Sequence, residues 1–406
     1  MSVPLTNFAP DYRIEINGGP IPDAMRACVT RVSYQDGIEG ADRVEITLAN
    51  PTLEWLDDVL LQVDNGFKLA IGYAPFPLDD VFVGEITGVS VSFPNSGVPT
   101  VTVVAHDFLQ RLTTGTKDRA FALSLPCIGK FPLPDPLIAG LVSFTNLLIP
   151  SIDPAGAALS FLTLLIAYAL DPLEAKRGVR IQQGQSDFDF LSKLAKDNGW
   201  EMYIDHTAAP RGRVLRFQFL LQDYKSTVDL KWGQSLIDFT PKISTVGQVA
   251  GISTRIWIPS IKMEFVIVLS WDFDRAAFDL MVFPGLGSVE ELVGSGKAQG
   301  ILKIEAIGPA TAPKTLLSEL LPRLNNRITA SANTIGNTKI KASKVINIDG
   351  IPGQFGGKYR VTTATHTIDS SGYRTQFDMR KEVWFGSIPV PKSASGVFRV
   401  QGQTIR

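Results

Sequence analysis

The residues of this chain best suited to chemistry are its histidines and cysteines, and their spacing argues against a metal site. His106, His206 and His366 lie far apart, and none has a neighbour at the spacing of a metal ligand. Cys28 and Cys127 form neither a metal-binding pattern nor a disulfide framework, so we interpret them as two unpaired thiols in a reducing compartment. The sequence therefore predicts no metal and no cofactor.

Two short glycine-containing patterns are similar to catalytic motifs, and both lack essential residues. Gly294-Ser295-Gly296-Lys297 is similar to a phosphate-binding loop. However, Glu291 stands in place of its first glycine, and Ala298 replaces the Ser or Thr that binds magnesium. Segments 184–186 and 233–235 both read Gly-Gln-Ser, but neither is followed by the closing glycine of a nucleophile elbow. Neither pattern predicts an active site.

Paired carboxylates are the remaining catalytic pattern. Asp79-Asp80 and Glu290-Glu291 could serve a glycosidase, whose two acids must converge on one cleft. Adjacent side chains on a strand or helix usually point apart, so we interpret both pairs as solvated loop charges. The sequence shows no nucleophile motif, no metal motif and no pair of acids expected to converge, and it therefore predicts that the chain is not an enzyme.

The charge balance of the chain limits its partners. Lys plus Arg number 39 and Asp plus Glu number 40 in 406 residues, so the cationic excess that binds nucleic acids or anionic membranes is missing. We expect no nucleic-acid recognition. Charged residues make up only 19% of the chain, which suits a subunit largely covered by other subunits. Residues 1–10 lack the regions of a secretory signal, so we expect synthesis and folding in the cytoplasm.

Strand-and-turn patterns dominate the elements that must position these residues. Alternating apolar and polar residues recur between turn residues from about 10 to 110, and again from 229 to 390. Regular short strands with such turns are typical of a small barrel or sandwich. Within the first region, the apolar spacing over 53–60 predicts one short helix.

Residues 179–228 predict a small α/β unit between these two regions. Ser186 begins a helix with a capping box, and Gly199 ends it as a C′ residue. Two alternating segments, 200–204 and 214–219, then predict strands.

One hairpin pattern occurs twice in the chain. Residues 83–105 alternate on both sides of a turn at Gly97, and residues 359–379 alternate on both sides of a turn at Gly372. A lone hairpin needs further strands to be stable. Each hairpin ends a stretch of strands, so the sequence predicts two related barrels in one chain.

The segment from 120 to 172 is apolar and punctuated by prolines. Its two apolar runs, 137–149 and 155–170, are 13 and 16 residues long, short of the roughly 20 residues of a membrane span. We interpret the segment as a helical insertion buried against other subunits, with a membrane-active segment as the alternative. The residues expected at this subunit interface are Leu137, Leu141, Phe144, Leu148, Phe161 and Leu165.

The predicted fold is mainly β with α+β elements. It comprises two tube-like antiparallel β-barrels per chain, a small α/β unit between them and a helical apolar insertion. The expected divisions are 1–118 for the first barrel, 119–178 for the apolar insertion and helix, 179–228 for the α/β unit, 229–390 for the second barrel with an insertion at about 262–336, and 391–406 for a C-terminal tail.

Four stretches in a fixed order carry a family resemblance. They are Ala-His-Asp-Phe-Leu-Gln-Arg-Leu at 105–112, Gln-Ser-Asp-Phe-Asp-Phe-Leu-Ser-Lys-Leu-Ala at 185–195 leading to Gly-Trp-Glu-Met-Tyr at 199–203, Leu-Ile-Asp-Phe-Thr-Pro-Lys-Ile at 236–243, and Gly-Lys-Tyr-Arg-Val at 357–361 continuing through His366 to Gly-Tyr-Arg-Thr at 372–375. By these stretches the chain resembles the phage late control protein D family, the hub of contractile tails. It is likewise similar to the hub portion of VgrG in type VI secretion.

The resemblance implies a homotrimer in which three chains place six similar barrels in a ring. Such a ring adapts a six-fold inner tube to a three-fold spike. VgrG chains continue into a spike, whereas this one stops at Arg406, so we expect a separate spike protein. The other expected partners are the inner tube protein, further baseplate subunits and tube cargo.

We therefore expect a non-enzymatic structural baseplate hub in a phage tail or contractile injection particle. The alternative function is a hub-derived cell-wall lytic enzyme or effector carrier, with its activity in the 120–172 or 262–311 segment.

Overall fold

The computed structural model describes most of the chain. The described residues are 9–125, 129–170, 179–219, 225–244, 251–258, 261–272, 277–285, 301–304, 312–385, 398–400 and 403–405. Cys127, the Glu290-Glu291 pair and the 294–297 loop lie outside these ranges. Within them the strands form four sheets, the largest of 13 strands, so the predicted mainly β class with α+β elements is confirmed. None of the helices in these ranges is long and apolar enough to span a membrane.

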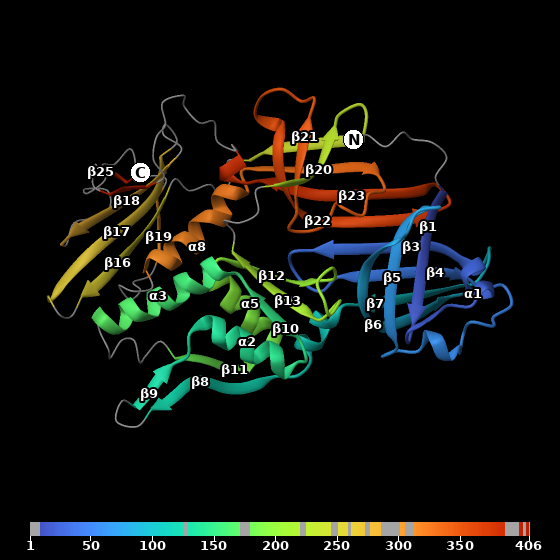
Figure 1. Cartoon of the computed structure of the whole chain (residues 1–406), viewed down its shortest axis with the longest axis horizontal. Helices are drawn as coiled ribbons and strands as arrows, with labels where there is room; N and C mark the ends of the chain where they lie inside the picture. The colour runs from blue at the N-terminus through green and yellow to red at the C-terminus, as the bar shows by residue number, and fades with distance from the viewer. Residues whose placement is uncertain are drawn as a thin grey trace.

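The first barrel-like unit is a sheet that curls around its own apolar core (Figure 1). Its elements are β1 (Ala9–Ile16), β2 (Gly19–Pro20), α1 (Asp23–Cys28), β3 (Val29–Gly37), β4 (Arg43–Ala49), β5 (Gly66–Ala74), β6 (Asp79–Ser92) and β7 (Thr100–His106). The strands pair in the order β3-β4-β7-β6-β5-β1-β2. Alternation gives the sheet two faces, since Val44, Ile46 and Leu48 of β4 point into the core while the residues between them point outward.

The second barrel-like unit curls around a separate core. Its strands are β14 (Ser226–Lys231), β15 (Leu236–Ile243), β20 (Ile328–Ile335), β21 (Val345–Asp349), β22 (Gly357–Asp369) and β23 (Gly372–Lys381). β15, β20, β23 and β22 are neighbours in the sheet, and β21 joins β22 to β14. Ala332 and Phe377 of facing strands point inward and pair across β20 and β23.

The two units repeat one topology. β3, β4, β5, β6 and β7 correspond to β15, β20, β21, β22 and β23, and each pairing among the first five strands recurs among the second five. The register shifts recur as well. Thr87 of β6 and Thr362 of β22 form equivalent bulges, and so do Thr30 of β3 and Ile237 of β15. One difference is that β1 pairs antiparallel with β5, whereas β14 pairs parallel with β21.

The hairpin pattern found twice in the sequence is confirmed. β6 with β7 and β22 with β23 form the two hairpins, and Gly97 and Gly372 at their turns both have a φ of 109°, a conformation that favours glycine. Both turns lie at the end of the sheet where β3 begins. The long connections that follow β7 and β15 leave from the opposite end.

The two units join into one sheet because β3 pairs with the C-terminal half of β22 through six residue pairs. Outward-facing residues are polar on both sides of this junction. One cross-strand row runs through Asn333, Gln376, Thr365, Gln35 and Arg43, from β20 to β4. A polar outer face therefore continues from one unit to the other.

The segment between the barrels forms an α/β layer. Its elements are β8 (Lys117–Leu125), β9 (Gly129–Pro132), α2 (Asp135–Thr145), β10 (Ile149–Ile152), α3 (Pro154–Leu170), β11 (Arg180–Gln185), α5 (Asp187–Asp197), β12 (Trp200–Asp205) and β13 (Val214–Phe219). As predicted, the Ser186 hydroxyl accepts the Asp189 N–H at 3.0 Å and Gly199 follows α5 with a φ of 65°. The sheet β10-β13-β12 and its shared core continue across residue 179, where the sequence suggested a division.

A further sheet combines four strands from the segment between β15 and β20 with two short strands from the C-terminal region. It contains β16 (Gly251–Ile258), β17 (Met263–Asp272), β18 (Ala277–Pro284), β19 (Ile301–Lys303), β24 (Phe398–Val400) and β25 (Gln403–Ile405), and α8 (Ala312–Asn325) packs on it. The insertion expected at about 262–336 thus begins earlier in the chain, and β20 at its expected end belongs to the barrel. Figure 1 shows this sheet on the side of the molecule away from α1.

Candidate functional site

A buried polar cluster lies where the first barrel meets the α/β layer. Asp42 precedes β4, Asp107 follows β7, and His206 follows β12. The His206 Nε2 atom lies 3.0 Å from Asp42 Oδ2 and 4.0 Å from Asp107 Oδ2. The Asp42 N–H donates to Asp107 Oδ2 at 3.2 Å, and Asp107 also accepts the Leu109 N–H that opens a short 3₁₀ turn (Phe108–Thr113). Three elements distant in sequence thus bring a His and two carboxylates together.

Hydrogen bonding indicates the tautomer of His206. The Val83 N–H donates to His206 Nδ1 at 3.2 Å, so Nδ1 carries no proton. The Nε2–H group then donates a hydrogen bond to Asp42 Oδ2. A metal bound through Nε2 would need that position free and would favour a proton on Nδ1, where the Val83 N–H already points. Asp42, Asp107 and His206 therefore fit a hydrogen-bonded network better than a metal site.

The network continues into the junction of the two barrels. The Tyr34 hydroxyl donates to Asp42 Oδ2 at 3.2 Å, and its ring stacks on His366 of β22 with centroids 5.7 Å apart. His366 lies within hydrogen-bond distance of the Ile340 carbonyl and the Tyr373 hydroxyl. Asp36, on the same strand as Tyr34, accepts the Ala342 N–H at 3.0 Å.

Burial shifts the titration of this network. Burial and the nearby Asp42 charge raise the pKa of Asp36 to about 7 and raise the pKa of Asp107 well above its usual range. Burial lowers the pKa of His366 to about 4. At neutral pH the junction therefore holds neutral imidazole at His366, and it favours retention of a proton among its carboxylates.

The cluster lacks the access that a catalytic site needs. Asp36, Asp42, Asp107 and His206 are each less than 9% exposed, so a substrate could not reach them without opening the interface between units. We interpret the cluster as structural. Sequence reasoning missed it because its members come from three separate elements and show no motif spacing. The one sequence signal is that Asp107 belongs to the 105–112 stretch that carried the family resemblance.

The other residues considered for chemistry lie apart. His106 contacts the Thr87 hydroxyl at 2.6 Å, and burial lowers its pKa. Asp79 contacts Thr338, and Asp80 pairs with Arg13 at 3.0 Å and with Arg211. Adjacent Asp79 and Asp80 thus have different partners, as expected of surface charges that do not converge on a cleft.

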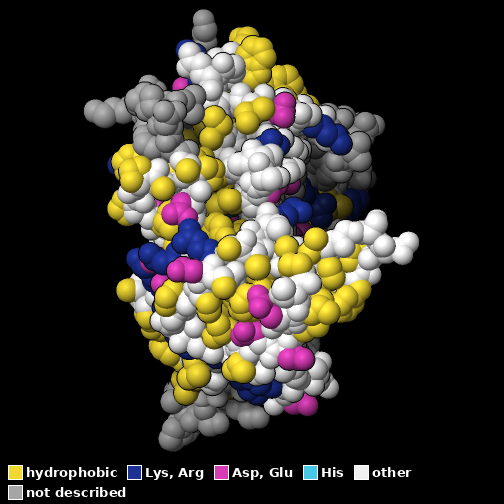
Figure 2. Space-filling view, turned by 90° about the vertical axis from the view of Figure 1, so that its right-hand side faces the viewer, with side chains coloured by type: hydrophobic (Ala, Val, Ile, Leu, Met, Phe, Trp, Pro, Cys, Tyr) yellow, Lys and Arg dark blue, Asp and Glu magenta, His cyan; other side chains and the backbone are white. Residues whose placement is uncertain are grey.

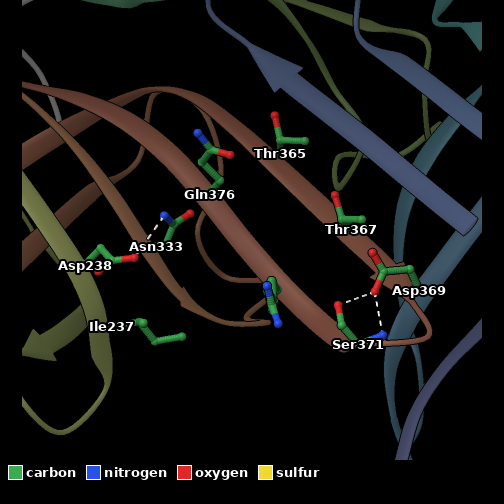
Figure 3. A pocket seen from close by; sticks show the side chains of 9 residues that line it. Ile237, Asp238, Asn333, Thr365, Thr367, Asp369, Ser371 and Gln376 are labelled. Atoms are coloured by element: carbon green, nitrogen blue, oxygen red, sulfur yellow. Dashed lines mark hydrogen bonds between the residues drawn. The ribbon is translucent and has the colours of Figure 1, made fainter.

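A hollow on the polar outer face gathers side chains from four strands (Figure 3). Its lining residues are Ile237, Asp238, Asn333, Thr365, Thr367, Asp369, Ser371, Arg374 and Gln376. Asn333 donates to Asp238 at 3.5 Å, and Asp369 accepts from Ser371. The lining contains no imidazole or thiol, so it offers a polar contact surface rather than a nucleophile with its base.

The apolar segment presents an exposed stripe on α2 and α3. On α2, Leu137 and Leu141 are 51% exposed and Phe144 is 61% exposed, at spacings that place them on one side of the helix. On α3, Phe161 and Leu165 are 40% and 65% exposed. Five of the six residues expected at an interface are thus available to a partner.

Leu148 must be removed from that set. It is 1% exposed and packs in the core shared by α2, α5 and β13, because it follows α2 where the chain turns into β10. A residue inside the chain's own core cannot contact another subunit.

Charge is mixed on the end of the molecule near α1. Figure 2 shows hydrophobic groups interspersed with small groups of Lys or Arg and of Asp or Glu, and neither sign dominates this face. The view agrees with the near balance of 39 basic and 40 acidic residues in the chain.

Three solved structures share this fold. A 43 kDa tail protein of prophage MuSo2 from Shewanella oneidensis is 12% identical, with a TM-score of 0.59 over 91% of this chain and 98% of that protein. A tail protein from Neisseria meningitidis MC58 is 10% identical, with a TM-score of 0.59 over 94% and 99%. A type VI secretion component from E. coli, described as structurally similar to the T4 tail proteins gp27 and gp5, is 12% identical, with a TM-score of 0.53 over 94% and 77%.

Sequence comparison adds no family to this fold. The chain matches no protein-family model, and no curated protein matches its sequence. At sequence identities of 10–12%, the similarity to these three structures shows only that the fold is shared. The fold is that of phage tail proteins and of a type VI secretion component, and at this level the resemblance seen in the sequence is confirmed.

Proposed function

We propose that this chain is a structural baseplate hub of a contractile phage-tail-like injection machine. The observation that carries the proposal is the repeat: two barrels of one topology, with equivalent bulges, joined edge to edge through β3 and β22. A subunit built this way presents two similar barrels per copy. The shared fold with phage tail proteins supports the same role.

In the proposed assembly three copies form a ring of six barrels. Such a ring can contact a six-fold inner tube on one side and a three-fold spike on the other, because alternate barrels are alike in topology but not in their attachments. The α/β layer and the sheet containing β16–β18 belong to one copy each and so recur three times. The proposed partners are two further copies, the inner tube protein, a spike protein, other baseplate subunits and tube cargo.

We further propose that the α2–α3 stripe docks on another subunit of the particle. Its apolar residues are exposed in the isolated chain, and clustered exposed apolar residues commonly mark an interaction site. The stripe lies in the α/β layer, outside the strands that join the barrels. Leu141→Ser with Phe144→Ser should leave the chain folded and should weaken its incorporation into particles, whereas normal incorporation contradicts docking through α2.

A lytic enzyme or effector carrier is the second candidate function. The buried cluster at Asp42, Asp107 and His206 gives it no accessible catalytic group, and the described outer hollow is lined by amides, hydroxyls and charges. These observations favour the structural role.

The mass of the purified full-length chain tests the proposal. We expect a particle of three times the 44.2 kDa chain mass by light scattering, and rings of six similar densities by electron microscopy. A stable monomer that degrades peptidoglycan contradicts the hub and supports the enzyme.

A further inference from the structure

β3 pairs with β22 inside the chain, but the strands that correspond to them in the repeat, β15 and β6, do not pair with each other. β15 corresponds to β3, and β6 corresponds to β22. β15 pairs along one side with β20, and beyond a single bridge at Leu236 no described strand follows its other side. β6 pairs with β5 only as far as Glu85, so no described strand covers that side of its C-terminal half, Gly88 to Ser92. Among the described strands, the two edges that would repeat the internal junction are therefore open.

The repeat defines the register that these edges would adopt. Counting from the equivalent bulges, Thr365 of β22 corresponds to Ser90 of β6, and Gln35 of β3 corresponds to Lys242 of β15. Thr365 pairs with Gln35 inside the chain, so Ser90 should pair with Lys242 of a neighbouring copy. The six transferred pairs are Gly88 with Ser244, Val89 with Ile243, Ser90 with Lys242, Val91 with Pro241, Ser92 with Thr240 and Phe93 with Phe239.

Apolar and polar residues alternate along both open edges, and the two patterns match. Positions that would face the barrel interiors are apolar on both strands, and positions that would face outward are polar. The inward set is Val89, Val91, Phe93, Phe239, Pro241 and Ile243, and the outward set is Ser90, Ser92, Thr240 and Lys242. Val91 is 39% exposed and Phe93 is 63% exposed, so covering this edge would remove apolar surface from water.

We propose that β15 of one copy adds antiparallel to the C-terminal half of β6 of the next copy in this register. The occupant is a second copy of this chain because the contact continues an interface that the chain already makes between its own barrels. The contact joins two different surfaces, and such head-to-tail contacts generate rings when the rotation closes. Closure after three copies rests on the proposed function.

Pro241 shapes this contact. The Ser244 N–H donates toward β20, to the Arg327 carbonyl, and alternate residues of a strand point their backbone groups to the same side. Pro241 therefore faces the open edge, where it has no N–H to donate. In the proposed contact the Val91 carbonyl therefore receives no hydrogen bond from Pro241. The stability of the contact then depends more on burial of its apolar residues. A proline on an open edge also discourages pairing with unrelated strands.

Engineered disulfides in the full-length chain test the register. In a background with Cys28→Ser and Cys127→Ser, Ser90→Cys with Lys242→Cys places two thiols at a predicted pair between copies, and Ser92→Cys with Thr240→Cys places them at a second. Directly opposed residues lie about 4.5–5.5 Å apart at Cα, within reach of a disulfide. We expect both variants to form covalent chains of two and three copies on mild oxidation, resolved on a non-reducing gel.

Two matched controls accompany these variants. Gln35→Cys with Thr365→Cys places thiols at the equivalent pair inside the chain and should form a disulfide without joining copies. Ser90→Cys with Thr240→Cys shares one cysteine with each test variant but is displaced by two residues. Its thiols lie on diagonal positions about 7–8 Å apart, so it should cross-link poorly.

The outcomes separate this contact from the hub itself. A trimer by light scattering with no cross-link at either predicted pair, while the internal control forms, overturns the β15–β6 contact and leaves the proposed function standing. Equal cross-linking of the displaced pair overturns the register. A chain that stays monomeric while the internal control oxidises overturns both the contact and the hub.

Discussion

The internal junction and the open edges occupy equivalent places in the repeat, yet they carry opposite chemistry. Inside the chain, Tyr34 stacks on His366, and Asp36 accepts a backbone N–H beside them. At the equivalent inward positions of the open edge, β15 carries Pro241 and Ile243. Buried polar groups need every partner in place and so specify one arrangement. Apolar residues can be exposed before assembly without leaving a buried polar group unpaired.

The largest expected effect comes from the buried ion pair of the second barrel. The Arg360 guanidinium is 1% exposed and donates to both Glu382 oxygens, at 2.7 and 3.1 Å. Arg360→Met removes both hydrogen bonds and leaves buried Glu382 with a 3.4 Å contact to Arg380, so we expect the free energy of unfolding to fall by about 3–5 kcal/mol in urea denaturation. Adding Glu382→Leu should restore part of the loss. A decrease below about 1 kcal/mol would contradict the role assigned to this pair.

Ile368 and Phe93 occupy equivalent positions on β22 and after β6, and they sharpen the comparison. Ile368 is 9% exposed and packs in the first barrel's core, whereas Phe93 is 63% exposed. Ile368→Ala should lower the unfolding free energy of the unassembled chain by about 2–4 kcal/mol. Phe93→Ala should change it by less than about 0.5 kcal/mol while weakening assembly. Similar losses of stability in the two variants would mean that Phe93 is already covered within one chain.

The pH dependence of stability tests the polar junction. Because burial beside Asp42 raises the pKa of Asp36 to about 7, the folded chain holds a proton that the unfolded chain releases near pH 4. This stabilisation is fully present below about pH 4 and is lost as the pH rises to about 7. Asp36→Asn should therefore stabilise the chain by on the order of 1–3 kcal/mol at pH 8, measured by urea denaturation.

His366 provides an opposing slope for the same experiment. Burial lowers its pKa to about 4, so its contribution is present above about pH 6.5 and is lost as the pH falls toward 4. In Asp36→Asn this slope should become more visible, and stability should decrease on acidification. A variant with the same pH profile as the parent chain would show that Asp36 does not hold the proton.

The smallest effect is expected at Glu85, the position of the first barrel that corresponds to Arg360. Glu85 pairs with Arg111, but the two side chains are 24% and 39% exposed. Surface pairs contribute at most about 1 kcal/mol, so Glu85→Gln should change the urea midpoint little. A loss comparable to that of Arg360→Met would remove the contrast between the barrels.

Local patterns were sufficient to predict the repeated hairpins and the helix from Ser186 to Gly199. The pattern over 53–60 was misleading, because the structure forms only a 3₁₀ turn (Val59–Leu61) and Leu53 has a φ of 62°. Apolar spacing alone cannot reveal a left-handed residue that interrupts a helix.

Contacts between segments far apart in the chain could not be predicted from the sequence. Nothing local shows that β3 pairs with β22 more than 300 residues away, or that Asp42 meets His206. Leu148 differs from its exposed neighbours only through the turn into β10, which buries it. The shared core of α2 with α5 likewise depends on packing between segments that the sequence suggested were separate.

The hairpin turns lie at one end of the sheet and the long connections at the other. The structure therefore repeats with a different period at each end. At the end with Gly97 and Gly372, each barrel contributes the same kind of turn, so the spatial period is one barrel. At the opposite end only the second barrel opens into the segment between β15 and β20, so the period is two barrels. In the proposed ring, a partner that binds the hairpin turns would find six similar sites. A partner that binds the inserted sheet would find three.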